Sequence, residues 1–358
     1  MPPWWAKSPH IQTILPVFTK VAKPALQRQR LELPDGDFID LDWQDVPQSG
    51  KPIVVIIHGL EGSAQSHYAR RILQACKEQQ LAAVVHHHRS CSGEANRLAR
   101  SYHSGDTDDL QFSLSTLKSA YPQSPLLAVG YSLGGNVLTK YQGEYQDDSL
   151  LARAVVVSAP LQLSACAKRL ENGFSKVYQS YLIKQLQQKI SHKLNDPDLA
   201  ISMPLSQSQV DRLNTFYDFD DKVTAPLHGF DGVDDYYTRA SGLPFVSRIT
   251  KPTLIIHAKD DPFMTDEVIP QSSQLSGYVE YELHPYGGHV GFIEGGTPWK
   301  PRFYLERRIL HFLLGDQSVD SLTAAPINGD NITQGNARQC DPRISLRSSG
   351  GWQLCQSR

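Results

Sequence analysis

The segment that most restricts the fold of this chain spans residues 126–145, where an apolar run, a serine and a helical pattern follow one another. Residues 126–129 read LLAV, typical of a short buried strand, and residues 136–145 are typical of a helix. Between them lies GYSLG at 130–134, which fits the pattern G-x-S-x-G. Its glycines let strand and helix pass close together, so that Ser132 sits on a sharp, strained turn. The helix N-terminus beneath such a serine favours developing negative charge.

The same rhythm of strand and helix recurs along the chain. A hairpin is predicted around Pro34-Asp35-Gly36, with antiparallel edge strands at 28–33 and 37–43. Strands alternating with helices imply an α/β fold with a mostly parallel central sheet and flanking helices, in which ligands bind at the carboxyl ends of the strands. The other predicted strands are 53–57, 81–85, 126–129, 154–160, 252–258 and 279–283, and the predicted helices are 68–79, 106–120, 136–145, 265–275 and 301–314.

This pattern divides the chain into a core and an insertion. Residues 1–160 and 251–315 are predicted to form the α/β core, with residues 1–26 irregular. Residues 161–250 contain helical patterns, notably 176–193, but no strand-loop-helix unit, so we expect a helical cap over the catalytic edge of the sheet. Residues 316–358 are polar and aperiodic, which predicts a disordered tail.

Net charge, apolar runs and cysteine content limit which partners the protein could bind and in which cellular compartment it could function. The formal net charge is −2, so no global field draws the chain to nucleic acid. No apolar run approaches the roughly 18 residues of a membrane span, and the first residues do not read as a signal peptide. Trp4-Trp5 either pack on the domain, which we favour, or anchor at a lipid interface. The cysteines are five in number and lack C-x-x-C spacing, which favours a reducing cytoplasm.

No metal or cofactor is predicted. His86-His87-His88 follow a predicted strand, but neighbours in an extended segment point to opposite faces, so at most two could converge on an ion. Neither G-x-x-x-x-G-K-[ST] nor a G-x-G-x-x-G after a strand is present, which argues against a phosphate or nucleotide site.

The residues that carry chemistry occur in the order Ser132, Asp260 or Asp261, His289, each in a loop after a predicted strand. A serine hydroxyl becomes nucleophilic when an imidazole takes its proton, and the imidazole needs a carboxylate to fix its tautomer. Asp261-Pro262 starts a turn into the next segment, so Asp261 is the preferred acid, with Asp260 solvated or bracing the loop. His58, in contrast, is expected to shape the backbone of its loop.

An anionic tetrahedral intermediate also needs hydrogen-bond donors. The backbone N–H groups of Leu133, directly after the serine, and of Leu60, in the loop after the strand 53–57, are the predicted oxyanion hole.

Six segments together make the chain resemble the YheT-type branch of the α/β-hydrolase superfamily, also called the AB hydrolase-4 family. They are SPHIQT at 8–13, HGLEGS at 58–63, RSCSGEANRLARSYHSGDTDD at 89–109, GYSLGGNVLTKY at 130–141, AKDDPFM at 258–264 and YGGHVGFIEG at 286–295. The resemblance implies an α/β-hydrolase fold over roughly residues 1–315. It also implies Ser132 as nucleophile, His289 as base, Asp261 as acid, and an ester rather than an amide as substrate.

The loop at 87–93 departs from the family pattern. Ser90 stands where the family usually has glycine, so Ser90 is strained if that position needs a positive φ. Arg89 is expected to brace the loop against Asp106 or Asp108 rather than to contact substrate.

The sequence therefore predicts a cytoplasmic serine hydrolase that cleaves small-molecule or lipid-like carboxylic esters through an acyl-enzyme. One alternative keeps the same triad in an acyltransferase or a phospholipase-like lipid enzyme. Another is a non-catalytic binder. The aromatic residues of the predicted cap either line an apolar acyl pocket or pack its own core; they are Phe174, Tyr178, Tyr181, Phe216, Tyr217, Tyr236 and Tyr237.

Overall fold

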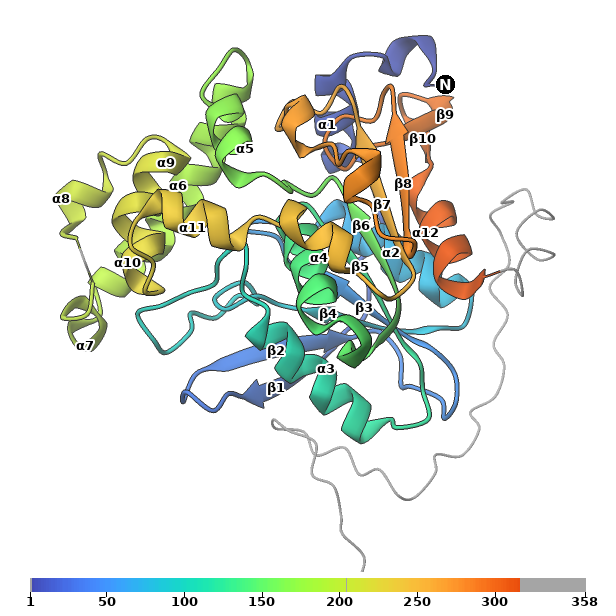
Figure 1. The fold of residues 1–358 in the computed structure, drawn as a ribbon, viewed down its shortest axis with the longest axis horizontal. Helices are drawn as coiled ribbons and strands as arrows, with labels where there is room; N and C mark the ends of the chain where they lie inside the picture. Colours follow the sequence, from blue (N-terminus) through green and yellow to red (C-terminus); the bar gives the residue numbers. More distant parts are fainter. Residues whose placement is uncertain (1, 204, 316–358) are drawn as a thin grey trace, which may run out of the picture.

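A twisted eight-stranded sheet forms the centre of the computed structural model, which describes residues 2–203 and 205–315 (Figure 1). The strand order is β1-β2-β4-β3-β5-β6-β7-β8, and all neighbours from β4 to β8 are parallel. The pairs β1–β2 and β2–β4 are antiparallel, as expected for a hairpin at the edge. The α/β fold class predicted from the sequence is confirmed. The strands are β1 (Gln27–Glu32), β2 (Phe38–Trp43), β3 (Ile53–Ile57), β4 (Ala82–His86), β5 (Leu126–Tyr131), β6 (Leu151–Val157), β7 (Thr253–Ala258) and β8 (Val279–His284).

Helices cover both faces of this sheet. The helices α3 (Asp108–Ala120) and α4 (Leu133–Tyr145) pack on one face, and α2 (His67–Glu78) and α12 (Leu305–Leu314) on the other. The side chains of β3 alternate between these two layers, because successive residues of a strand point to opposite faces. All five β3 residues are therefore buried, as the β-branched sequence IVVII predicts for a central parallel strand.

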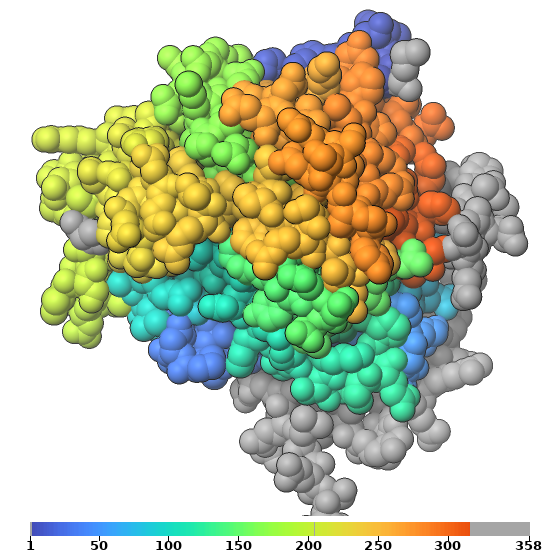
Figure 2. Space-filling view, in the orientation of Figure 1, coloured from blue at the N-terminus to red at the C-terminus, as the bar shows by residue number. Residues whose placement is uncertain are grey.

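A long insertion separates β6 from β7. It is helical, and its longest helix, α6 (Ser175–Leu194), lies close to the predicted helix 176–193. In the space-filling view the yellow insertion abuts the teal residues near position 100 of the core (Figure 2). The other helices of the insertion are α5 (Leu163–Leu170), α7 (Pro197–Ala200), α8 (Gln207–Val210), α9 (Phe216–Phe219), the π-helical turn Asp220–Thr224, α10 (Ala225–Leu227), α11 (Val233–Ala240) and the 3-10 helix Leu243–Arg248.

Asn136 of α4 ties the insertion to the core. Its side-chain amide donates to the backbone oxygens of Ser104 and Ala240 at 2.7 and 2.8 Å, and its side-chain oxygen accepts from the Gly242 N–H at 2.8 Å. This buried amide therefore fixes both the loop before α3 and the end of the insertion directly below the turn at Ser132.

Three sequence predictions of secondary structure were wrong. Residues 9–18, expected to be irregular, form helix α1 (Pro9–Phe18), which begins with proline in its favoured first turn. The helix predicted at 265–275 is two 3-10 turns, Asp266–Val268 and Ser272–Gln274. Pro270 lies between them and disfavours the α conformation of the residue before it. The last helix begins at Leu305, because the preceding residues form an unpredicted hairpin of β9 (Ile293–Thr297) and β10 (Lys300–Phe303).

Four further expectations concern the tryptophan pair, membrane-spanning segments, the cysteines and the C-terminal residues. Trp5 donates a hydrogen bond to the Gly296 oxygen, but Trp4 is 84% exposed, so only one of the two tryptophans packs on the domain. Within the described residues no helix is long and apolar enough to cross a membrane. The described cysteines, Cys76, Cys91 and Cys166, are free and buried. The prediction for residues 316–358 lies outside the described residues.

Candidate active site

Ser132 occupies a strained turn between β5 and α4. Its φ and ψ are 52° and −121°, a region that residues other than glycine seldom adopt. The turn is held from both sides, because the Ser132 N–H donates to the Val157 oxygen at 2.8 Å and the Ser132 oxygen accepts from the Asn136 N–H at 3.0 Å. The hydroxyl therefore stands at the carboxyl end of the central strand in a fixed position.

The flanking glycines are required by close backbone contacts. A Cβ on Gly130 would lie 2.5 Å from the Gly134 oxygen, and a Cβ on Gly134 would lie 2.4 Å from the His58 oxygen. No side chain fits in either place, because β5, α4 and the end of β3 are in backbone contact there. The G-x-S-x-G pattern therefore has its glycines at these contacts.

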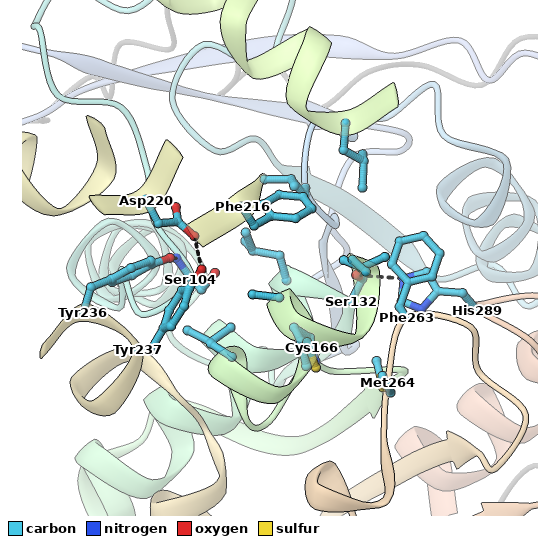
Figure 3. A pocket seen from close by; sticks show the side chains of 17 residues that line it. Ser104, Ser132, Cys166, Phe216, Asp220, Tyr236, Tyr237, Phe263, Met264 and His289 are labelled. Carbon is cyan, nitrogen blue, oxygen red and sulfur yellow. Dashed lines mark hydrogen bonds between the residues drawn. The ribbon is translucent and has the colours of Figure 1, made fainter. Parts of the chain in front are cut away.

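Three loops bring Ser132, His289 and Asp261 together, and Figure 3 shows the contact between Ser132 and His289. His289 Nε2 lies 2.9 Å from Ser132 Oγ, and His289 Nδ1 lies 2.9 Å from Asp261 Oδ2. The other Asp261 oxygen accepts from the Phe263 N–H at 2.8 Å, and the residue is 4% exposed. The carboxylate is thus fixed by a backbone donor on one side and by the imidazole on the other.

Asp260 has a different position from its neighbour. Its Oδ1 accepts from the N–H groups of Gly287 and Gly288, both at 2.9 Å, and burial raises the pKa of this carboxyl above its ordinary value. Asp260 therefore braces the loop that carries His289 and does not contact the imidazole.

Sequence reasoning gave no role to Phe263, although it belongs to the segment AKDDPFM. Its ring stacks on the His289 imidazole with centroids 4.0 Å apart and an interplanar angle of 14°. Tyr178 of α6 packs in turn on Phe263, at 4.9 Å between centroids. The ring of His289 is thus held between its carboxylate partner and an aromatic pair.

Helix α1 holds the His289 loop from outside, which sequence reasoning also missed. The His289 N–H donates to Thr13 Oγ1 at 2.9 Å, and the Ile293 N–H donates to Gln12 Oε1 at 2.7 Å. A Cβ on Gly291 would lie 1.9 Å from the backbone oxygen of Gln12, so the backbones of helix α1 and of the loop are in contact. The segment SPHIQT was the available signal, but nothing in it indicated its partner.

Leu60 and Leu133, the predicted oxyanion residues, both border the cavity that contains Ser132. Leu133 is the first residue of α4, where an N–H has no partner within its own helix. The loop of Leu60 touches the serine turn, since a Cβ on Gly59 would lie 3.0 Å from the Ser132 Cβ. Phenolic oxygens of Tyr68 and Tyr102 accept from the N–H groups of Gly59 and Glu61, both at 2.9 Å, and so fix this loop.

His58, His86 and His88 form a buried cluster near this loop. His58 Nδ1–H donates to the Gly59 oxygen at 2.8 Å and its Nε2 accepts from the His88 N–H at 3.2 Å, so His58 shapes the backbone. Burial lowers the pKa of His86 and of His88 to about 3. Within the described part of the chain, no group of histidine, cysteine or acidic side chains is arranged to hold a metal ion.

The loop after β4 is braced as expected, but by other partners. Arg89 binds Asp109 through Nε and Nη2, both at 2.7 Å, and Asp35 and Asp37 through Nη1 at 2.7 and 3.0 Å. The prediction of Asp106 or Asp108 as its partner was therefore wrong. Asp106 lies just before α3 and pairs with Arg100. Ser90 has a φ of 62°, the positive value that makes serine strained at this glycine position.

Two spaces of different character meet at Ser132. A small chamber of about 90 Å³ lies under the insertion, bordered by Leu163, Ala167, Phe216, Tyr236 and Tyr237 (Figure 3). At its far end burial raises the pKa of Asp220 to about 6, and Tyr237 donates to that carboxyl at 2.8 Å. On the other side an open groove of about 740 Å³ runs between α1 and α6 and also reaches Ser132 and His289.

The insertion aromatics are divided between these places. Phe216, Tyr236 and Tyr237 line the chamber while packing against the apolar residues of α5 and α11, and Tyr178 and Tyr181 border the groove. The sequence allowed these aromatics either to line a pocket or to pack the core of the insertion. Tyr236 and Tyr237 do both.

Comparison with known proteins agrees with this architecture. Residues 52–296 match the family model described as the alpha/beta hydrolase fold. The chain therefore belongs to the α/β-hydrolase family, and within it to the YheT-type branch. It is 46% identical over 307 residues to "Putative esterase YheT" of Escherichia coli (strain K12), covering 85% of this chain and 89% of that protein.

Two more distant relatives have the names of lipid-hydrolysing enzymes. The chain is 28% identical to "Phospholipase ABHD3" of Homo sapiens, over 87% of this chain and 78% of that protein. It is 25% identical to "Monoacylglycerol lipase" of Saccharomyces cerevisiae, over 81% of this chain and 64% of that protein. The solved Pyrococcus furiosus esterase Pf2001 matches with a TM-score of 0.51 at 16% identity, covering 82% of this chain and 97% of that one, which shows the shared fold.

Proposed function

We propose that this protein is a serine hydrolase that cleaves carboxylic esters through an acyl-enzyme intermediate. The observation that carries the proposal is the pair of 2.9 Å contacts that link Ser132 Oγ to His289 Nε2 and His289 Nδ1 to Asp261. The similarity to proteins named as an esterase, a phospholipase and a lipase supports an ester as the bond that is cleaved.

The mechanism begins with proton transfer. Asp261 accepts the Nδ1–H of His289, which leaves Nε2 free to accept the Ser132 proton while Oγ attacks the ester carbonyl. The protonated imidazole then gives its proton to the departing alcohol. Water enters, His289 deprotonates it, and the acid is released with Ser132 restored.

The charge that develops on the carbonyl oxygen needs donors. We assign this role to the N–H groups of Leu60 and Leu133, both of which border the chamber beside Ser132. One such donor contributes about 3 kcal/mol to transition-state binding. The N-terminus of α4 adds its dipole at the same point.

The two spaces at Ser132 define the shape of substrate that fits. The chamber is small and mostly apolar, so one side of the ester bond is short, whereas the groove accepts a larger apolar portion on the other side. We propose that residues 161–250 act as a cap, because α5, α6 and α11 all contribute side chains to the lining of the chamber.

A second candidate function uses the same triad on phospholipids or passes the acyl group to an alcohol. The apolar groove and the lipase and phospholipase relatives favour the lipid version. A rise in transfer product with added alcohol would identify an acyltransferase.

The free buried thiols agree with the predicted cytoplasmic location, which fractionation of cells would test.

The decisive experiment is turnover of p-nitrophenyl esters of graded acyl length, together with monoacylglycerols and a phospholipid. Ser132→Ala and His289→Ala are expected to lower kcat by roughly 10⁴-fold or more. Asp261→Asn should lower kcat strongly, and Asp260→Asn, the matched control, should lower it much less. Labelling of Ser132 by a fluorophosphonate distinguishes an untested substrate from an inert site. Wild-type protein that neither turns over nor labels would contradict the proposal.

A further inference from the structure

Helix α1 has its polar and apolar faces reversed. Gln12 and Thr13 are buried against the His289 loop, whereas the apolar Ile11, Ile14, Val17 and Phe18 point outward. Val17 is 57% exposed and Phe18 is 76% exposed. An amphipathic helix on a core normally does the opposite, so this face is available to an apolar environment outside the protein.

The long insertion helix α6 presents a matching stripe. Phe174 just before α6, with Val177 and Tyr181 on it, follow the spacing i, i+3, i+7, and Tyr181 is 67% exposed. The His10 ring lies 4.4 Å from that of Phe174. Val17 and Phe18 of α1 and Val177 and Tyr181 of α6 line opposite sides of the groove that leads to Ser132. The two stripes therefore form one apolar rim around the entrance to the site.

Most of the charged side chains around this rim are basic. Residues 1–26 contain Lys7, Lys20 and Lys23 and no acidic residue, and α6 contains four lysines and no acidic residue. Lys176 and Lys184 on α6 are exposed, and they line a neighbouring recess that also contains Glu171. Glu61, the acidic residue that lines the groove, is paired with Lys189 at 2.9 Å. Although the net charge of the whole chain is −2, the rim itself is basic.

We propose that the rim formed by α1 and α6 docks on an anionic lipid surface and opens the groove directly onto it. The apolar residues enter the boundary between headgroups and acyl chains, and the lysines contact the negative headgroups. A lipid-like ester then passes from the surface along the groove to Ser132. The inference rests on the proposed function for its substrate, but the docking itself requires no turnover.

The test measures binding separately from catalysis. The full chain carrying Ser132→Ala is floated with vesicles of phosphatidylglycerol and, separately, of phosphatidylcholine, so that no lipid is hydrolysed. Binding is expected to be at least about tenfold tighter to phosphatidylglycerol and to weaken with salt. Val17→Ser with Phe18→Ser should reduce binding by about tenfold or more. Lys20→Gln with Lys23→Gln and Lys184→Gln should remove most of this preference for phosphatidylglycerol.

Matched controls come from the opposite edge of the sheet. Val46→Ser with Tyr278→Ser changes two residues of comparable exposure, and Lys51→Gln with Lys77→Gln and Lys118→Gln removes three other charges. Both control sets should bind like the parent, with melting temperatures monitored for every variant.

Several outcomes would overturn the inference. Equal loss of binding in the control and rim variants would do so, as would an absence of vesicle binding by a folded protein. A dimer in solution that dissociates in the Val17/Phe18 variant would show that a second copy covers the rim instead. If vesicles bind as expected but wild type hydrolyses no ester, the proposed function fails while the docking surface stands.

Discussion

The turn at Ser132 and the loop at His289 meet through one hydrogen bond, but they are held in place differently. The turn is fixed by residues close in sequence, since Gly130, Gly134 and Asn136 all lie within four positions of the serine. The loop is fixed from far away, because Thr13 is 276 positions from His289. One half of the candidate site is thus a local structure, whereas the other exists only when the folded chain brings α1 to it.

The His289 loop also carries more backbone strain than the turn. Within it Gly288, Val290 and Phe292 all have positive φ, at 54°, 62° and 49°. For the β-branched Val290 this conformation is a true outlier, and such strain persists only where surrounding contacts impose it. Asp260, Ser158 and α1 supply those contacts. The comparison therefore predicts that the loop is the more easily disturbed half.

The largest effect is expected from Gly134→Ala. Its Cβ would lie 2.4 Å from the His58 oxygen and 2.5 Å from the Ile57 oxygen, between elements that cannot separate without breaking the sheet's core contacts. We expect the free energy of unfolding, measured in urea, to fall by about 3 kcal/mol or more. Gly277→Ala, whose Cβ would meet nothing within 4 Å, is the matched control and should change it by less than about 0.5 kcal/mol. Equal stability of the two variants would show that the turn is not the rigid half.

Gly291→Ala should separate activity from stability. Its Cβ would collide with the Gln12 oxygen at 1.9 Å, but α1 lies on the surface and can move away without opening the sheet. We therefore expect a smaller loss of unfolding free energy than for Gly134→Ala, with kcat lowered by roughly 10- to 100-fold because His289 loses its support. A stability loss as large as that of Gly134→Ala would contradict the division into a rigid and a supported half.

The same division explains which features the sequence revealed. The turn at 130–134, the hairpin around residues 34–36 and the six parallel strands follow from local spacing and apolar runs, and they were predicted within a few residues. Helix α1 was missed because Pro9 and Pro16 weaken its pattern and because its buried residues are polar. The helix supports the loop through hydrogen bonds from residues 12 and 13 to Ile293 and His289. No local sequence pattern indicates that these distant residues meet. For Arg89 the bracing role was predictable, but the choice among several nearby aspartates depended on the folded loop.

The smallest effect, and the most specific test of the long-range half, is expected from Thr13. Thr13→Val keeps the shape of the side chain but removes the oxygen that accepts the His289 N–H at 2.9 Å. The loss of one such bond, about 1 kcal/mol, should lower kcat about fivefold and leave KM nearly unchanged, because this hydroxyl already bonds the Pro9 oxygen and the His289 N–H. Thr13→Ser restores the oxygen and should restore kcat. If Thr13→Ser is as slow as Thr13→Val, then the methyl group packs α1 against the loop and the hydrogen bond is incidental. If both variants match wild type, His289 is positioned by Asp261 and Phe263 alone, and α1 serves the groove rather than the triad.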